Sequence, residues 1–137
     1  ANFIQKVTQH VKGKKLAVWG LAFKPNTDDI RFAPSLYIIE ELLKLGYEIT
    51  AFDPAATNNV KKKMGEQITF ATDMYSAVDG ADALLIFTEW NEFKQAHLDK
   101  VKTGLKSPVI IDGRNLYLTD KMKEMGFTYI STGRRQV

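Results

Sequence analysis

The chain has 137 residues, 45% of them hydrophobic and 26% charged, which is the size and composition of one globular domain with a buried core. It contains no cysteine, so these residues cannot form a disulfide, a thiolate zinc site or a cysteine nucleophile. The formal net charge of +3 is small, and the chain lacks the broad basic stripe with interleaved aromatic residues that a nucleic-acid surface needs.

The first half of the chain predicts two helices and two strands in alternation. Residues 1–11 carry apolar side chains at helical spacing, so we expect an amphipathic helix that ends at Gly13. Residues 15–19 form a short apolar run that is typical of a buried strand. Residues 34–45 begin with a proline and predict a well-buried helix, and residues 47–52 predict the next strand.

The second half continues this alternation. We expect helices over 57–64, from the N-cap Asp73 to about Gly80, and over 91–102 and 119–125, with strands over 68–70, 82–88, 108–112 and 127–130. Short strands separated by helices imply right-handed crossovers. The predicted fold class is therefore α/β, with a doubly wound, mostly parallel, six-stranded Rossmann-like sheet and helices on both faces.

Charged side chains follow two strands that should lie close together in this sheet. In the common strand order 3-2-1-4-5-6, the carboxyl ends of the first, fourth and fifth strands border one crevice. Lys24 follows the first strand and Arg114 follows the fifth, so both cations should face that crevice. A lysine and the planar fork of an arginine suit a diphosphate, and Phe23 could stack on a base or sugar. The segment from Gly20 to Arg31 is thus the main predicted anion site.

These residues also have structural interpretations. Lys24 could be a solvated loop lysine, and Arg114 could anchor its loop to Asp112 or Asp28. For the two cations we favour ligand binding. Asp28 and Asp29 resemble a metal or acid–base pair, but adjacent carboxylates in such a loop more often accept backbone hydrogen bonds. We therefore favour the structural interpretation for this acidic pair.

Two further segments lie at the ends of predicted strands. Asp53 closes the second strand, where a dinucleotide-binding fold places its ribose-binding acid. The phosphate-binding glycines that should accompany it are absent, so we interpret Asp53 and Pro54 as a turn. Glu89 and Trp90 follow the fourth strand and could shape the crevice wall, with packing and ligand contact both open.

The remaining features indicate no metal site and no membrane segment. His10 and His97 lack metal-ligand spacing and are expected on the surface, and the lysine run at 61–63 predicts a solvated helix face. No apolar run approaches the ~18 residues of a membrane span, and residues 2–15 lack the apolar centre of a signal peptide. We expect a cytoplasmic protein with no membrane contact.

Several motifs agree in order and spacing with one known family. They are Gly-Leu-Ala-Phe-Lys-Pro-Asn-Thr-Asp-Asp-Ile-Arg at 20–31, Pro34, Asp-Pro at 53–54, Thr-Glu-Trp at 88–90, Phe93 and Asp-Gly-Arg-Asn at 112–115. Together they resemble the C-terminal UDP-binding domain of the UDP-glucose/GDP-mannose dehydrogenase family, and the pattern is most similar to its UDP-glucose 6-dehydrogenases. Members of this family oxidise the C6 hydroxyl of the sugar to a carboxylate, using two NAD in succession.

The resemblance implies a division of the chain. Residues 1–13 would be the end of an inter-domain connecting helix, and residues 14–137 the nucleotide-sugar-binding domain. In the family, an N-terminal Rossmann domain holds most of the NAD, and a cysteine outside this domain forms the covalent intermediate. The resemblance thus implies part of an NAD-dependent enzyme of polysaccharide biosynthesis that is inactive alone, forms a homo-oligomer at full length, and has the rest of the dehydrogenase chain as its partner.

The resemblance also assigns roles to four residues. Phe23, Lys24 and Arg114 would contact the UDP-sugar, and Arg31 would point toward the NAD pyrophosphate. None of the four makes or breaks a bond, so the implied set contains no catalytic residue and no metal ligand. The family generally has an acidic residue after this arginine, whereas this sequence has Phe32, which removes a partner that could orient Arg31.

Other functions stay open at this point. The enzyme could act on another nucleotide sugar, such as a UDP-N-acetylhexosamine or GDP-mannose. The domain could instead bind NAD in its own right, although the absent glycine fingerprint argues against this. A non-catalytic nucleotide-binding module that recruits a partner is the third possibility.

Overall fold

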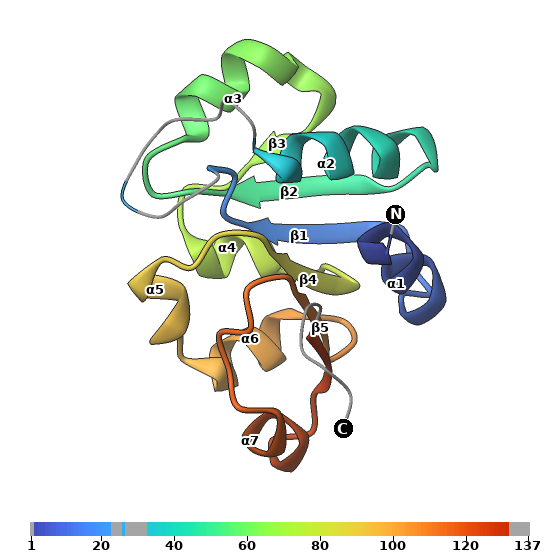
Figure 1. Cartoon of the computed structure of the whole chain (residues 1–137), viewed down its shortest axis with the longest axis vertical. Helices are drawn as coiled ribbons and strands as arrows, with labels where there is room; N and C mark the ends of the chain where they lie inside the picture. Colours follow the sequence, from blue (N-terminus) through green and yellow to red (C-terminus); the bar gives the residue numbers. More distant parts are fainter. Residues whose placement is uncertain (1, 23–25, 27–32, 132–137) are drawn as a thin grey trace.

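The strands form one parallel sheet in the order β3-β2-β1-β4-β5-β6 (Figure 1). They span Lys15–Trp19 (β1), Glu48–Phe52 (β2), Thr69–Phe70 (β3), Ala83–Ile86 (β4), Val109–Asp112 (β5) and Thr128–Ser131 (β6). This computed structural model describes residues 2–22, 26 and 33–131. All five strand pairs are parallel, which confirms the predicted fold class and the predicted strand order.

One helix precedes the first strand, and the others lie on the connections from one strand to the next. They span Asn2–His10 (α1), Pro34–Lys44 (α2), Thr57–Met64 (α3), Met74–Val78 (α4), Asn91–Lys94 (α5), Leu98–Gly104 (α6) and Thr119–Glu124 (α7), with a 3-10 turn at Gly65–Gln67 (η1). None of the helices in the described ranges is long and apolar enough to cross a bilayer.

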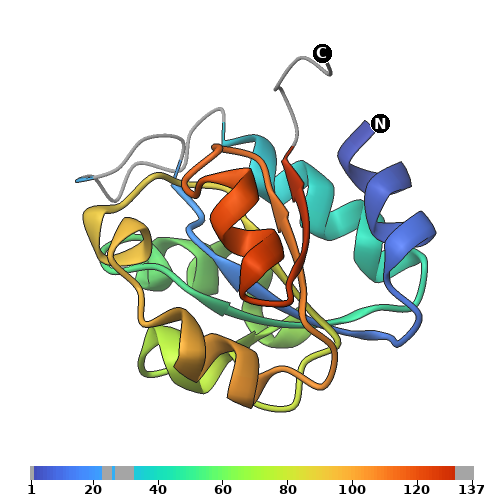
Figure 2. The same cartoon turned by 90° about the horizontal axis from the view of Figure 1, so that it is seen from below.

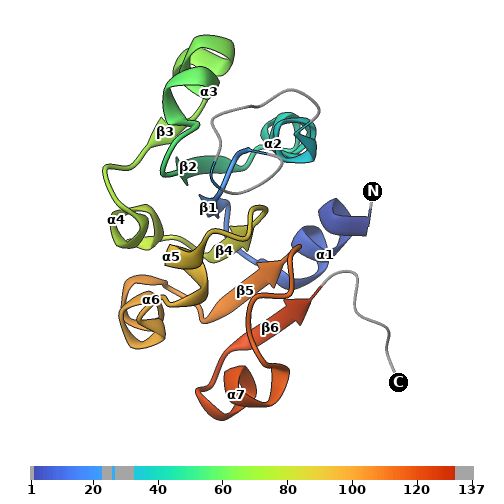
Figure 3. The same ribbon diagram turned by 60° about the vertical axis from the view of Figure 1, so that its left-hand side comes forward.

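Alternating side chains of the central strands build two separate cores. In β1, Leu16 and Val18 join the core under α1, α2 and α3, whereas Ala17 and Trp19 join the core under α4 to α7. Successive side chains of a strand point to opposite faces, and a parallel sheet covered on both faces buries both sets. Figure 3 shows α1 and α2 on one side of the strands and α4 and α6 on the other. The prediction of helices on both faces is confirmed.

The first helix packs on the same core as α2 and α3. Phe3, Val7 and Val11 are buried, and the rings of Phe3 and Phe87 lie 4.7 Å apart between centroids. Figure 2 shows α1 beside α2. The division of function between residues 1–13 and 14–137 stays a prediction.

One predicted helix is wrong. The segment 91–102 forms two short helices, α5 and α6, because the backbone at His97 is extended, with φ −76° and ψ 95°. The His97 N–H donates a hydrogen bond to the Tyr75 hydroxyl at 2.9 Å, and Tyr75 belongs to α4. A partner 22 residues away therefore interrupts a segment whose local pattern is helical.

Candidate functional site at the carboxyl ends of the central strands

The carboxyl ends of β1, β4 and β5 lie side by side at one edge of the sheet. This is the crevice of a doubly wound sheet, where the direction of winding reverses. Of the four residues with predicted binding roles, the structure places Arg114 at this edge. The other three, Phe23, Lys24 and Arg31, lie outside the described residues, as does Phe32.

A buried carboxylate holds the backbone where the chain leaves β1. Asp53 is only 3% exposed, and its Oδ2 accepts hydrogen bonds from the N–H groups of Leu21 (2.8 Å) and Ala22 (3.2 Å). Its Oδ1 accepts from Ala55 and Ala56 at 2.8 and 2.7 Å. The bonds from Ala55 and Ala56 form the turn that the sequence predicts at Asp53 and Pro54. The bonds from Leu21 and Ala22, more than 30 positions away along the chain, show that Asp53 also joins the exits of β1 and β2.

Two buried hydroxyls hold the carbonyls of the same segment. Thr88 Oγ1 donates to the carbonyl of Ala22, and Ser35 Oγ donates to that of Leu21, both at 2.6 Å. Gly20 has a φ of +89°, and a Cβ there would lie 2.5 Å from the Thr88 side chain. The sequence does not identify Thr88 and Ser35 as anchors of this segment. The signal for each is only its position, at the end of a predicted strand for Thr88 and at the start of a predicted helix for Ser35.

A second buried carboxylate shapes the loop that carries Arg114. Asp112 is fully buried, and its Oδ1 accepts hydrogen bonds from the N–H groups of Arg114 (2.7 Å) and Asn115 (3.0 Å). Its Oδ2 accepts from the Leu116 N–H at 2.8 Å and the Tyr129 hydroxyl at 2.7 Å. The alternative that Arg114 anchors its loop to Asp112 is thus correct for the main chain, while the side chain has a different partner.

The loop after β5 is also tied to the helix after β4. The Tyr117 hydroxyl donates to the carbonyl of Phe93 at 2.5 Å. Burial, with a smaller effect from the negative charge of Asp112, raises the pKa of the Tyr117 phenol. The phenol therefore stays protonated and remains a hydrogen-bond donor at physiological pH.

The Arg114 guanidinium pairs with Glu89, the residue after Thr88. Its Nη2 lies 3.0 Å from Glu89 Oε1, and the two side chains are 32% and 40% exposed. The pair is therefore open to solvent and can be approached by a ligand. The next residue, Trp90, packs against the second core, and its buried indole N–H has no hydrogen-bond partner among the described residues.

Arg114 lines a pocket of about 160 Å³ where α1 and α2 meet the strand ends. The other lining residues are Phe3, Ala22, Pro34, Ser35, Ile38, Phe87 and Gly113. Among the described residues, the pocket thus combines the Arg114 cation with residues from the exits of β1, β4 and β5 and an apolar wall. Such a combination suits a ligand with an anionic group attached to a less polar part.

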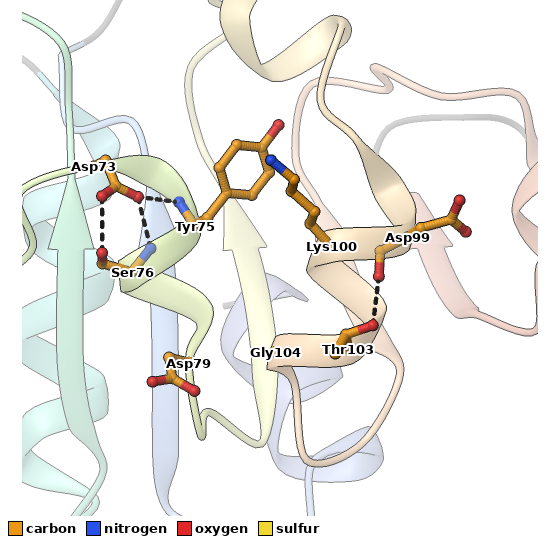
Figure 4. Close-up of a pocket in the computed structure, with 8 residues that line it drawn as sticks. All are labelled: Asp73, Tyr75, Ser76, Asp79, Asp99, Lys100, Thr103 and Gly104. Carbon is orange, nitrogen blue, oxygen red and sulfur yellow. Dashed lines mark hydrogen bonds between the residues drawn. The ribbon is translucent and has the colours of Figure 1, made fainter.

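A larger hollow, of about 580 Å³, lies in the groove between α4 and α6, and Figure 4 shows its lining. Three of its eight lining residues are acidic: Asp73, Asp79 and Asp99. Its one cation, Lys100, places its Nζ over the Tyr75 ring, 5.1 Å from the centroid. This acidic balance does not suit a phosphate ligand, so the strand-end pocket is the better candidate for binding an anion.

The N-cap of α4 gives a prediction for pH. The Asp73 carboxylate accepts hydrogen bonds from the Ser76 N–H, the Ser76 hydroxyl and the Tyr75 N–H, and these lower the pKa of Asp73 (Figure 4). We expect carboxyl ¹³C NMR titration to show a raised pKa of Asp73 in a Ser76→Ala variant, because one bond to the carboxylate is lost. An unchanged pKa of Asp73 would contradict this assignment.

The sign of the stability effect follows from the same shift. Since the folded pKa of Asp73 is below its unfolded value, the capping contribution is fully present above the ordinary carboxyl pKa. It is lost as the pH falls through the lower, folded value. Thermal unfolding of wild type and Ser76→Ala should therefore differ less in strong acid than at neutral pH.

Within the described ranges, no three His, Cys, Asp or Glu side chains are grouped so as to hold a metal ion. His10 and His97 are exposed, and so are the three lysines at 61–63, which confirms these surface predictions. Asp28 and Asp29 lie outside the described residues, so their structural role stays a prediction.

Comparison with known proteins gives a consistent result. Residues 17–119 match the family model described as "UDP-glucose/GDP-mannose dehydrogenase family, UDP binding domain". Over 127 residues, the chain is 50% identical to UDP-glucose 6-dehydrogenase TuaD of Bacillus subtilis, covering 93% of this chain and 28% of that protein. It is 44% identical to UDP-glucose 6-dehydrogenase of Pseudomonas aeruginosa, covering 90% of this chain and 28% of the relative.

Solved structures agree on the fold. A UDP-glucose dehydrogenase from Pyrobaculum islandicum superposes with a TM-score of 0.75 at 27% identity, covering 96% of this chain and 28% of that one. An NDP-N-acetyl-D-galactosaminuronic acid dehydrogenase from Methanosarcina mazei gives a TM-score of 0.78 at 27% identity, and the match covers 98% of this chain and 27% of that one. The chain therefore spans less than a third of the length of these proteins.

Proposed function

Because the chain belongs to the UDP-glucose/GDP-mannose dehydrogenase family as its UDP-binding domain, we propose that it holds the nucleotide of UDP-glucose in a UDP-glucose 6-dehydrogenase. The enzyme would oxidise UDP-glucose to UDP-glucuronate and reduce two NAD. The observation that carries this proposal is Arg114, held by Asp112 and Glu89 at the pocket where β1, β4 and β5 end. A guanidinium suits a diphosphate because its planar fork can donate two parallel hydrogen bonds.

In this proposal the chain binds substrate, and the bond-making chemistry belongs to other parts of the enzyme. Phe23 and Lys24 would complete the UDP-sugar contacts begun by Arg114. No residue here acts as the covalent nucleophile, since the chain contains no cysteine. The relatives named UDP-glucose 6-dehydrogenases are 50% and 44% identical to this chain, which supports UDP-glucose as the substrate.

NAD would be the hydride acceptor, held mainly outside this chain. The described residues do not fit a dinucleotide: β1 ends at Trp19, α2 begins at Pro34, and the sequence between them has no Gly-x-Gly-x-x-Gly turn. Arg31 would be the one contact from this chain toward the NAD pyrophosphate. The enzyme would work in the cytoplasm as a homo-oligomer, in polysaccharide biosynthesis.

Calorimetric titration of the 137-residue chain with UDP, GDP and NAD tests this proposal. We expect weak binding of UDP and weaker or no binding of the other two ligands, because part of the substrate site lies outside this chain. We also expect no NAD reduction with UDP-glucose, since the nucleophile is missing. A preference for NAD would overturn the proposed function, and a preference for GDP would change the substrate.

A further inference from the structure

Glu89 brings a negative charge to a site that is proposed to bind an anion. Its Oε1 lies 3.0 Å from Arg114 Nη2, and 40% of its side chain is exposed. A carboxylate in this position is unfavourable for phosphate binding, because it repels the ligand and occupies one guanidinium donor. Its presence therefore needs a reason beyond charge balance with Arg114.

Hydrogen bonds hold the backbone next to Glu89 and the backbone of Arg114. Thr88, the neighbour of Glu89, is fully buried and donates its hydroxyl hydrogen to the Ala22 carbonyl. The N–H of Arg114 is held by the buried carboxylate of Asp112 at 2.7 Å. The buried bond of Thr88 and the partly buried bond between Asp112 and Arg114 hold the two backbones in place, so Glu89 stays close to any ligand that Arg114 binds.

The pair uses only part of the guanidinium. An arginine has five N–H donors, and the bond to Glu89 uses Nη2 alone. Arg114 can therefore bind a phosphate oxygen while it keeps Glu89. Two hydrogen bonds and the width of the guanidinium separate such an oxygen from the Glu89 carboxylate, which is a distance of at most about 8 Å. This distance does not exceed the Debye length, which is about 8 Å at physiological salt. The carboxylate must then repel each negative charge on that phosphate.

We propose that Glu89 is a specificity-determining residue that disfavours ligands with a free terminal phosphate, so that the Arg114 site prefers a nucleotide sugar to a free nucleoside diphosphate. The inference rests on the proposed function. A terminal phosphate has a second ionisation near pH 6, so UDP carries about one more negative charge at neutral pH than a UDP-hexose, whose diphosphate is a diester. Glu89 penalises that extra charge and leaves the sugar diphosphate less affected.

The test is to measure the dissociation constants of UDP and UDP-glucose for wild type, Glu89→Gln and Glu92→Gln at neutral pH and low salt. The Gln side chain at position 89 keeps the size and an acceptor oxygen but loses the charge. Glu92 is an exposed acid on α5, three positions further along, so its replacement makes the same change in net charge. The ratio of the two constants isolates the effect of the ligand's extra charge.

We expect Glu89→Gln to tighten UDP binding relative to UDP-glucose roughly twofold to fivefold, the scale for one charge about 8 Å away in a partly solvated site. Glu92→Gln should leave the ratio unchanged, and 0.5 M salt should shrink the effect at position 89. If the ratio is unchanged in Glu89→Gln while UDP still binds, the inference about Glu89 is overturned and the proposed function is not. Absence of UDP binding in the wild type would overturn the proposed function with it.

Discussion

Replacing Asp53 by Asn is expected to lower the free energy of unfolding by about 3 kcal/mol. The carboxylate accepts four backbone hydrogen bonds, two on each oxygen, in a site that is 3% exposed. An Asn side chain has nearly the same shape, but its amide NH₂ would face two N–H donors. Those donors would stay buried without an acceptor, which costs about 1–3 kcal/mol each.

Urea unfolding, followed by far-UV circular dichroism, measures this effect. Asp73→Asn is the matched control, because Asp73 also accepts backbone hydrogen bonds but is solvent-exposed, so water can replace the lost acceptor. We expect a clearly smaller loss for the control. A loss of less than about 1 kcal/mol for Asp53→Asn would show that the two strand exits do not depend on this carboxylate.

Replacing Arg114 by Ala is expected to weaken UDP binding by about 1.5–3 kcal/mol, or roughly tenfold to 150-fold. The reason is the loss of charge-assisted hydrogen bonds to the diphosphate, together with an uncompensated Glu89 beside the ligand. Arg114→Lys should recover only part of the affinity, because lysine keeps the charge and loses the planar fork.

Calorimetry with UDP measures this loss. Lys94→Ala, an exposed residue on α5, makes the same change in net charge and should bind UDP like the wild type. Circular dichroism should show an intact fold in both variants, because the hydrogen bonds of Asp112 involve the main chain of residue 114 and not its side chain. Unchanged UDP affinity in a folded Arg114→Ala variant would make the arginine purely structural.

Part of the fold could be predicted because its signal is local. The apolar runs of β1, β4 and β5 and the proline at the start of α2 are visible in short windows of sequence. Their alternation with helices leaves few topologies, since crossovers between parallel strands are right-handed. The break at His97 could not be predicted, because the Tyr75 hydroxyl that accepts its N–H comes from another helix.

The candidate site, like the fold, could be predicted only in part from the sequence. The place of Arg114 follows from its position directly after a strand, since parallel strands all end at the same edge of the sheet. Its side-chain partner does not follow. The sequence offers Asp112 or Asp28 as the partner, whereas the structure shows Glu89, which is 25 residues away and becomes a neighbour only when β4 and β5 pair.

The alternation of strands and helices, the family, and the edge of the sheet at which Arg114 lies follow from residue type and spacing along the chain. Three further contacts are visible only in the folded protein: Asp53 holds the exit of β1, Thr88 anchors the segment beside it, and Glu89 accompanies Arg114. Those contacts join residues 25 to 66 positions apart. They exist only after the crossovers have brought the strand ends together, so no local pattern of residues can encode them.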